Sequence, residues 1–253
     1  MSLLEAPAVN AGIDALRLDA VGMDFGERHA LNALSIAIAP GEVYALLGPN
    51  GAGKTTTLNL ILGFLQPQAG RIEVAGIDVG RDPLAARAKI AYLPETVMLH
   101  PSLDAIENLS YFALLGGRRL NASEARDLLS QAGLQAEAHT RRAGGFSKGM
   151  RQKVGLAVAL AKNAQLLLLD EPTSGLDASA ANDLSQGVRA AAQRGIAVLM
   201  ATHDLYRVKD VAHRLGILRA GTLLTERRTE ELSAAQIEAL YLELLASDES
   251  AAA

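Results

Sequence analysis

Apolar residues follow two alternating patterns along the chain. Short apolar runs bounded by Gly, Asn and Pro alternate with stretches in which apolar residues recur every three or four positions. The first pattern is typical of strands and the second of amphipathic helices. Strands are predicted at residues 13–21, 34–38, 42–47, 71–74, 90–93, 166–170, 196–201 and 214–219. Helices are predicted at residues 54–65, 102–116, 124–132, 147–162, 178–193, 204–211 and 229–245, with a frayed tail at 247–253.

Three hydroxyl side chains mark predicted helix starts. Ser123, Ser147 and Thr229 each stand at the start of a helical pattern. A hydroxyl in this position can accept a hydrogen bond from a free backbone amide of the first turn. Gly133 is expected to end the helix at 124–132, because glycine readily takes the left-handed conformation found just after a helix.

The order of these elements predicts an α/β fold. Repeated β-α-β alternation implies a mainly parallel sheet with helices on its faces. A helical block at about residues 96–162 interrupts the alternation, and we predict that it is a subdomain inserted into the sheet domain. The sheet domain is expected to span residues 13–225, followed by a C-terminal helix and tail at 226–253.

Composition then narrows the possible classes of protein. A chain of 253 residues with 49% hydrophobic content can bury a substantial core. The net charge of -4 argues against bulk attraction to nucleic acid or to anionic lipid, so no nucleic acid partner is expected. The absence of cysteine excludes disulfides and thiolate metal sites. Residues 1–12 lack a signal-peptide pattern and no apolar run is long enough for a membrane span, so a cytosolic chain is expected.

A phosphate-binding motif stands between a predicted strand and a predicted helix. Residues 48–55, GPNGAGKT, fit the pattern G-x-x-x-x-G-K-[ST] in full. Glycines allow successive backbone amides to surround a phosphate, and the following helix adds the positive end of its dipole. Lys54 is expected to reach the β- and γ-phosphates, while the Thr55 hydroxyl can bind Mg²⁺. The motif by itself does not choose among kinases, GTPases, recombinases and transporters.

An acidic pair follows the most apolar predicted strand. Residues 166–170 read LLLLD, and Glu171 comes next. A buried strand of this kind delivers Asp170 to the carboxyl edge of the sheet, where it can hold Mg²⁺ through water. The side chain of Glu171 points differently and can polarise an attacking water molecule.

Five motifs in one order resemble the ATP-binding subunits of ABC transporters. They are GPNGAGKT at 48–55, FSKGM at 146–150, LLLLDE at 166–171, PTSGLD at 172–177 and THD at 202–204. The resemblance extends over about residues 13–225. It implies a P-loop NTPase fold with a mainly parallel sheet, an N-terminal antiparallel β subdomain and an inserted helical subdomain. It also implies hydrolysis of ATP, with Mg²⁺ as cofactor.

The resemblance implies two groups of nucleotide contacts. Phe25 stands where the family has an aromatic residue that stacks on adenine. Ser147 and Gly149 are the retained members of the family signature LSGGQ, which faces the γ-phosphate held by the opposite subunit. The phosphate contacts implied within one chain are Gly48, Pro49, Asn50, Gly51, Ala52, Gly53, Lys54, Thr55 and Thr56.

The same resemblance implies the metal ligands and the catalytic groups. The metal ligands are Thr55, Glu95 and Asp170. The catalytic groups are Lys54, Glu171 and His203, where His203 corresponds to the switch histidine that contacts the γ-phosphate. Each of these groups acts by position or by charge, as phosphoryl transfer requires.

The signature departs from LSGGQ at three of its five positions, Phe146, Lys148 and Met150, and Glu95 is a further departure from the family motifs. Lys148 replaces a glycine and Met150 a glutamine in the signature, and Glu95 stands where glutamine is usual. Glutamate keeps an oxygen at the same reach but adds a negative charge and loses the amide donor. The YLPE and SKGMRQ versions resemble the exporter-type, ABC-2-like branch. They are also similar to the ATPase of copper-site maturation in nitrous oxide reductase.

The resemblance implies two kinds of partner. One is a second ATP-binding subunit, which would form a homodimer, and the other consists of integral membrane permease subunits. The chain would then be cytoplasmic and peripheral on the inner face of the membrane. The helices at 102–116 and 124–133, between Glu95 and Ser147, are the expected permease docking surface.

Three other classes of protein share a phosphate loop or an ABC-type cassette. A soluble ABC-type ATPase of translation or DNA repair would usually carry two cassettes or a long coiled coil, and this chain has one phosphate loop and no sustained heptads. A P-loop kinase or GTPase would lack the signature and His203. A regulator that does not hydrolyse ATP would not need both Glu171 and His203.

Overall fold

The computed structural model describes residues 13–246 and contains two β-sheets. The first sheet is antiparallel and has the order β2-β1-β4-β5. Its strands are β1 (Leu16–Phe25), β2 (Arg28–Ile38), β4 (Ala69–Val74) and β5 (Ile77–Asp78). This confirms the antiparallel β subdomain near the N-terminus. The first strand begins and ends later than predicted, so that Phe25 is its last residue.

The second sheet is parallel except at one edge and has the order β10-β9-β3-β8-β7-β6. Its strands are β3 (Val43–Leu47), β6 (Ile90–Leu93), β7 (Leu166–Asp170), β8 (Ala197–Thr202), β9 (Arg214–Arg219) and β10 (Thr222–Arg228). All five residues of β3 are buried, and they alternate between two apolar clusters on opposite faces. A central parallel strand buried on both faces gives the continuous apolar run seen in the sequence.

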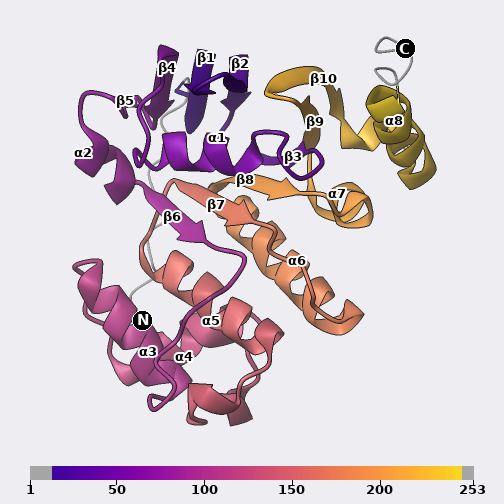
Figure 1. Cartoon of the computed structure of the whole chain (residues 1–253). Helices are drawn as coiled ribbons and strands as arrows, with labels where there is room; N and C mark the ends of the chain where they lie inside the picture. The colour runs from indigo at the N-terminus through magenta and orange to yellow at the C-terminus, as the bar shows by residue number, and fades with distance from the viewer. Residues whose placement is uncertain (1–12, 247–253) are drawn as a thin grey trace.

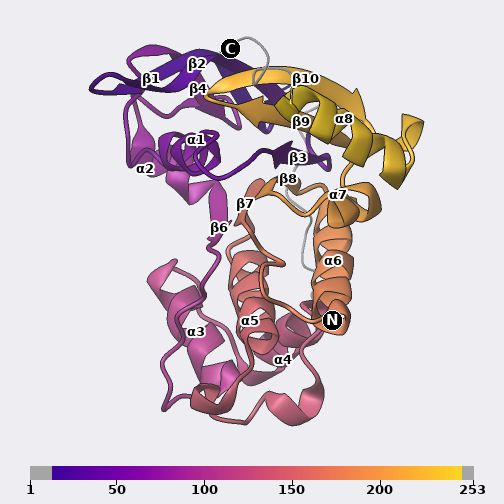
Figure 2. The same ribbon diagram turned by 45° about the vertical axis from the view of Figure 1, so that its right-hand side comes forward.

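One helix lies between the two sheets. α1 (Lys54–Ile61) contacts β2 and β4 on one side and β7 and β8 on the other (Figures 1 and 2). It is shorter than the predicted 54–65, because the chain leaves the helix at Gly63, whose φ is 67°. A short helix that the sequence analysis did not predict, α2 (Pro83–Ala88), starts at the cap Asp82.

The opposite face of the second sheet is covered by helices that extend into a separate arm. The arm lies at the bottom of Figure 2 and contains α3 (Ala105–Leu115), α4 (Ala122–Gln131) and α5 (Lys148–Ala161), while α6 (Ala178–Gln193) packs beside α5. α3, α4 and α5 occupy the chain between β6 and β7, where the inserted block was predicted, while α6 follows β7. One apolar cluster is continuous from the sheet into the arm. The arm is therefore packed against the sheet domain through a shared core.

The cap predictions had mixed outcomes. Ser147 caps α5, with its Oγ accepting from the Met150 amide at 3.2 Å, as predicted. Ser123 is not a cap, because Asn121 accepts from two amides and Glu124 bonds back to its main chain, which completes a capping box. The helix therefore begins two residues earlier than predicted.

The C-terminal part of the chain also differs from the prediction. β10, an edge strand of mixed polarity, was not predicted, and residue 225 falls inside it. Thr229 does not cap a helix: it is buried and its hydroxyl donates to the carbonyl of Ala212. After α7 (Leu205–Val211), the last helix is α8 (Ala234–Ala246), and Ser233 bonds to its first turn. The expected frayed tail at 247–253 lies outside the described residues, as do residues 1–12.

None of the helices within residues 13–246 has the length and apolar composition needed to cross a lipid bilayer.

Candidate nucleotide site

The phosphate loop connects the buried strand β3 to α1. An added Cβ at Gly48 would overlap the Leu218 carbonyl oxygen and lie 2.8 Å from the Ala52 side chain. Gly53 has a φ of 111°, and a Cβ there would lie 2.6 Å from the Ala30 carbonyl oxygen. The loop is thus packed so closely against the first β-hairpin and β9 that side chains at these two positions cannot fit.

Lys54 is the first residue of α1 and is 6% exposed. Its Nζ donates to the Gly48 carbonyl at 2.5 Å and to the Pro49 carbonyl at 3.3 Å. The same atom lies 3.5 Å from Glu171 Oε1. A buried ammonium is therefore held at the loop, facing the carboxylate that follows β7.

A cleft of about 260 Å³ lies in front of the phosphate loop. Its lining joins the β1–β2 hairpin, the loop and the carboxyl ends of β6 and β7. The lining residues are Phe25, Arg28, Ala30, Pro49, Asn50, Gly51, Ala52, Gly53, Lys54, Thr55, Thr56, Glu95, Asp170 and Glu171. The cleft thus brings together the predicted adenine, phosphate and metal residues except Gly48, and includes Phe25, which is 48% exposed.

Asp170 ends β7 and accepts a hydrogen bond from the Tyr92 hydroxyl at 3.3 Å. Burial raises the pKa of Asp170, and the negative charges of Glu171 and Glu95 raise it further, against the lowering effect of the Tyr92 bond. Burial together with the nearby Asp170 carboxylate raises the pKa of Tyr92 to about 12. Tyr92 therefore remains a hydrogen-bond donor at neutral pH.

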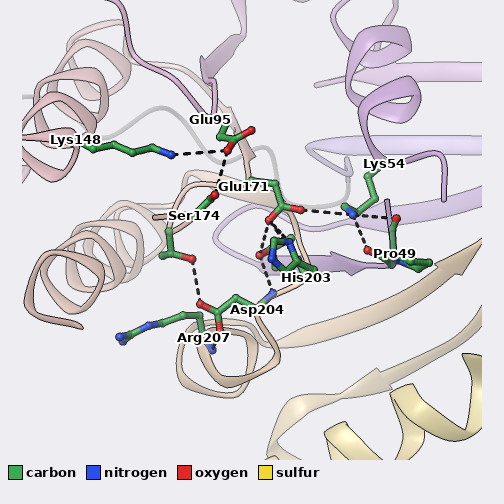
Figure 3. A network of polar contacts seen from close by, with 12 residues as sticks. Pro49, Lys54, Glu95, Lys148, Glu171, Ser174, His203, Asp204 and Arg207 are labelled. Atoms are coloured by element: carbon green, nitrogen blue, oxygen red, sulfur yellow. Dashed lines mark hydrogen bonds and ion pairs between the residues drawn. The ribbon is translucent and has the colours of Figure 1, made fainter. Parts of the chain in front are cut away.

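Glu171 has a left-handed backbone with a φ of 44°, which is unusual for a residue with a long side chain. Its amide still continues the sheet by bonding to the Ala201 carbonyl at 2.9 Å. The turn directs its carboxylate to Lys54, to the Thr202 hydroxyl at 3.2 Å and to His203, whose Nδ1 lies 2.9 Å from Oε2 (Figure 3). Strained backbone and three polar partners fix one position for this carboxylate.

Glu95 follows β6 and points to the loop after β7. Its Oε1 accepts from the Ser174 hydroxyl at 3.0 Å and lies 3.7 Å from Lys148 Nζ (Figure 3). It borders the nucleotide cleft as well. Two of the departures from the family motifs, Glu95 and Lys148, are therefore in contact.

Ser147 and Gly149 do not line this cleft. They lie at the start of α5 in the helical arm, with Ser147 exposed and Gly149 buried. A Cβ at Gly149 would lie 2.7 Å from the side chain of Ala180, so glycine here allows α5 and α6 to approach closely. Within one chain, the signature therefore lies outside the cleft of the phosphate loop, and its contact with a nucleotide of the opposite subunit stays a prediction.

Four contacts of the site were not anticipated. Arg28 lines the cleft and donates to the Gly51 carbonyl at 3.1 Å, and Tyr92 bonds to Asp170. Thr202 and Ser174 bond to the acidic residues Glu171 and Glu95. Thr202 and Ser174 lie inside motifs that were identified for their neighbours. Arg28 belongs to no recognised motif, and only its position shortly after Phe25 could have indicated that it lines the cleft.

The acidic residues of the cleft suit a cation that is shared with a bound phosphate. Among residues 13–246, no three His, Cys, Asp or Glu side chains converge closely enough to hold a metal by themselves. Thr55, Glu95 and Asp170 nevertheless place side-chain oxygen atoms around one cleft, and burial raises the pKa of Asp170, with the nearby carboxylates Glu171 and Glu95 raising it further. Mg²⁺ is usually held in this manner, by one or two protein oxygens together with substrate phosphates and water.

The loop, the acidic edge of the sheet and the intervening helix define a P-loop nucleoside triphosphatase. The arm with its signature at the start of α5 is the further feature of a particular family. The family model described as ABC transporter matches residues 31–174. The chain belongs to the ABC transporter family and is an ATP-binding and ATP-hydrolysing member of it.

Curated relatives agree with this assignment. The chain is 35% identical over 238 residues to the Nod factor export ATP-binding protein I of Paraburkholderia xenovorans (strain LB400), covering 92% of this chain and 77% of that protein. It is 36% identical over 223 residues to a daunorubicin resistance ATP-binding protein of Streptomyces coeruleorubidus, covering 87% and 70%.

Solved structures of the same family share the fold. An ATP-binding subunit of an ABC transporter matches with a TM-score of 0.78 and 29% identity, over 91% of this chain and 99% of that one. An ATP-binding cassette in a dimeric post-hydrolysis state with ADP and Pi matches with a TM-score of 0.74 and 26% identity, over 85% and 98%. The expected α/β fold of an ABC ATPase is thus confirmed. The narrower similarity to the copper-maturation ATPase stays a prediction.

Proposed function

We propose that the chain uses ATP hydrolysis to power export through separate permease subunits. The observation that carries the proposal is the connected set Lys54, Glu171 and His203 beside the phosphate loop, with distances of 3.5 Å and 2.9 Å between successive partners. The names of relatives that act in Nod factor export and daunorubicin resistance support the direction of transport. The cargo itself contacts the permease in this arrangement.

In the proposed site, the cleft binds Mg·ATP. Phe25 stacks on adenine, and the residues from Gly48 to Thr56 surround the phosphates with backbone amides and the Lys54 ammonium. Thr55, Glu95 and Asp170 would hold Mg²⁺, which would supply positive charge beside the phosphate oxygens. Asp170 needs its ionised form for this role, and Lys54 favours that form.

Glu171 orients and polarises the attacking water in this proposal. Its fixed position, held by Thr202, His203 and Lys54, lets it accept a hydrogen bond from water in line with the γ-phosphate. His203 is 61% exposed and has one ring nitrogen engaged by Glu171, which leaves the other for the γ-phosphate. The catalytic power then comes from position and charge, without a covalent intermediate.

Stacking by Phe25 is tested with two ligands. Phe25→Ala is expected to weaken ATP binding by about 5- to 150-fold, because base–aromatic stacking contributes about 1–3 kcal/mol. Inorganic tripolyphosphate, which has no base, should bind the variant as well as the unaltered chain. Isothermal titration calorimetry measures both affinities. Phe25→Tyr is the matched control and should retain ATP binding; equal weakening of both ligands would show that Phe25 supports the loop instead of the base.

A second copy of the chain completes each site in this proposal. Ser147 and Gly149, outside the cleft of their own chain, would face the γ-phosphate held by the partner copy. The start of α5 adds free amides and the positive end of its dipole toward that phosphate. The dimeric state of the solved cassette supports this arrangement.

The permease is proposed to dock in an apolar groove between the sheet domain and the arm. The groove has a volume of about 290 Å³ and is lined by Leu62, Phe64, Arg87, Ile90, Ala91, Tyr92, Phe112, Ala113, Gly116, Val158, Ala159 and Lys162. Phe64 is 64% exposed, and the Arg87 guanidinium lies 6.0 Å from its ring centroid. Lys162 donates to the Arg87 carbonyl, and burial with the neighbouring Arg87 lowers its pKa. A short apolar helix that carries a carboxylate would complement this lining.

If the permease docks in this groove, a substitution there should prevent assembly with the permease without changing ATP hydrolysis by the isolated chain. Phe64→Asp is expected to abolish co-purification with the permease by placing a charge at the apolar groove, while the isolated chain keeps its ATPase rate. Leu84→Asp is the matched control, since Leu84 is 72% exposed but lies outside the groove. Pull-down from membranes that contain the permease measures the result. Retention of Phe64→Asp would refute the groove as the docking site.

In this arrangement the chain is cytoplasmic and peripheral at the inner face of the membrane. The bounds 13–225 for the ATPase domain remain part of the proposal, with α8 beyond them. Reconstitution with the permease in vesicles, followed by measurement of ATPase stimulation by candidate cargo, tests the transport role. An ATPase rate that is unaffected by any permease would instead favour a soluble, non-transport role.

A further inference from the structure

The two charged departures from the family motifs form a pair within one chain. Glu95 Oε1 lies 3.7 Å from Lys148 Nζ and accepts a hydrogen bond from Ser174 Oγ at 3.0 Å (Figure 3). A single carboxylate oxygen therefore contacts both the start of the signature helix and the loop that follows Glu171. The usual glutamine and glycine of these positions could not form a charge pair.

The main chain at Glu95 is fixed to the signature helix by a second contact. Gln152 of α5 is fully buried and donates to the Glu95 carbonyl at 2.7 Å and to the Pro94 carbonyl at 3.3 Å. With its backbone held in this way, the Glu95 carboxylate moves by rotation of its own side chain. That side chain is 52% exposed, so surrounding atoms do not enclose it on all sides.

Two environments compete for this carboxylate. On one side are Lys148 and Ser174, and on the other is the cleft lined by Thr55 and Asp170. Glu95 already contributes negative charge at Asp170, which places it within electrostatic range of the proposed metal position. A metal in the cleft would draw the carboxylate away from Lys148 and Ser174, which it contacts through Oε1.

We propose that Lys148 is a positioning residue that competes with Mg²⁺ for the Glu95 carboxylate. In the open subunit, Lys148 holds Glu95 on Ser174, and Mg·ATP releases it toward the cleft. Release of the Glu95 carboxylate would free Lys148, which follows Ser147 in the signature, together with Ser174. Binding of the metal would thereby be linked to the position of the signature, which faces the second copy in the proposed dimer. The inference rests on the proposed function.

The test measures how much Mg²⁺ the full-length chain needs to bind a fluorescent β,γ-imido analogue of ATP. Lys148→Met is expected to lower the half-saturating Mg²⁺ concentration by about two- to fivefold, the range of a partly exposed ion pair. Affinity for the analogue in EDTA should not change, because Lys148 acts on Glu95 and not on the nucleotide. Arg126→Met is the matched control: it removes the same charge from an exposed position of α4 and should leave the Mg²⁺ requirement unchanged.

The same substitution in the Glu95→Gln chain distinguishes a positioning role of Lys148 from a general effect on stability. In the Glu95→Gln chain, Lys148→Met should have no effect on the Mg²⁺ requirement, because no carboxylate remains to compete for. The same shift in both backgrounds, an unchanged requirement in the Glu95 chain, or a changed affinity in EDTA would each overturn the inference. Failure of the unaltered chain to bind the analogue at any Mg²⁺ concentration would overturn the proposed function instead.

Discussion

Lys54→Met is expected to weaken ATP binding by about 30-fold or more and to abolish measurable ATP hydrolysis. Loss of one partner from a buried charge-assisted contact costs about 2–5 kcal/mol. Lys54 is 6% exposed and faces the cleft from the loop itself, so the remaining phosphate charge would be left without its closest cation. Equilibrium binding of a fluorescent ATP analogue measures the effect.

Lys209→Met provides the matched control for this substitution. Lys209 also donates to a backbone carbonyl, that of Thr229 at 2.7 Å, but it lies on α7 and does not line the cleft. The control should bind ATP like the unaltered chain. Equal loss of binding in both variants would mean that a destabilised fold, and not a missing phosphate contact, explains the result.

Glu171→Gln is expected to reduce ATP hydrolysis by about 100-fold or more while ATP binding is retained. The amide keeps the size of the side chain and can still accept from Thr202, but it cannot polarise water as a carboxylate does. A coupled-enzyme assay of ADP release gives the rate, and Glu230→Gln, an exposed position, serves as the control. A variant with the unaltered rate would remove Glu171 from the catalytic assignment.

The phosphate loop and the acidic edge of the sheet could be predicted from the sequence because their chemistry is local. Backbone amides around a phosphate require glycines at fixed spacing, and a buried parallel strand requires an uninterrupted apolar run. Residues 48–55 and β7 satisfy these requirements with consecutive residues. The structure accordingly places Lys54, Asp170 and Glu171 around one cleft.

Features that depend on packing between distant segments could not be predicted. β10 carries charged residues on an edge strand, and its partner β9 supplies the pairing. Thr229 resembles a helix cap in sequence, yet its hydroxyl donates a hydrogen bond to the Ala212 carbonyl, 17 residues earlier in the chain. Glu95 and Lys148 were each identified as departures, but their contact arises only because the arm folds back on β6.

ATP-dependent dimerisation of the Glu171→Gln chain tests the central claim most directly. Sedimentation velocity of the purified chain should show a monomer without nucleotide and a dimer with two bound ATP molecules when Mg·ATP is added. Dimerisation is expected because the cleft of one chain contains neither its own Ser147 nor its own Gly149. Two results together would contradict the proposed ATP-dependent dimer. The Glu171→Gln chain would stay monomeric with ATP bound, and the hydrolysis rate of the unaltered chain would rise in strict proportion to protein concentration.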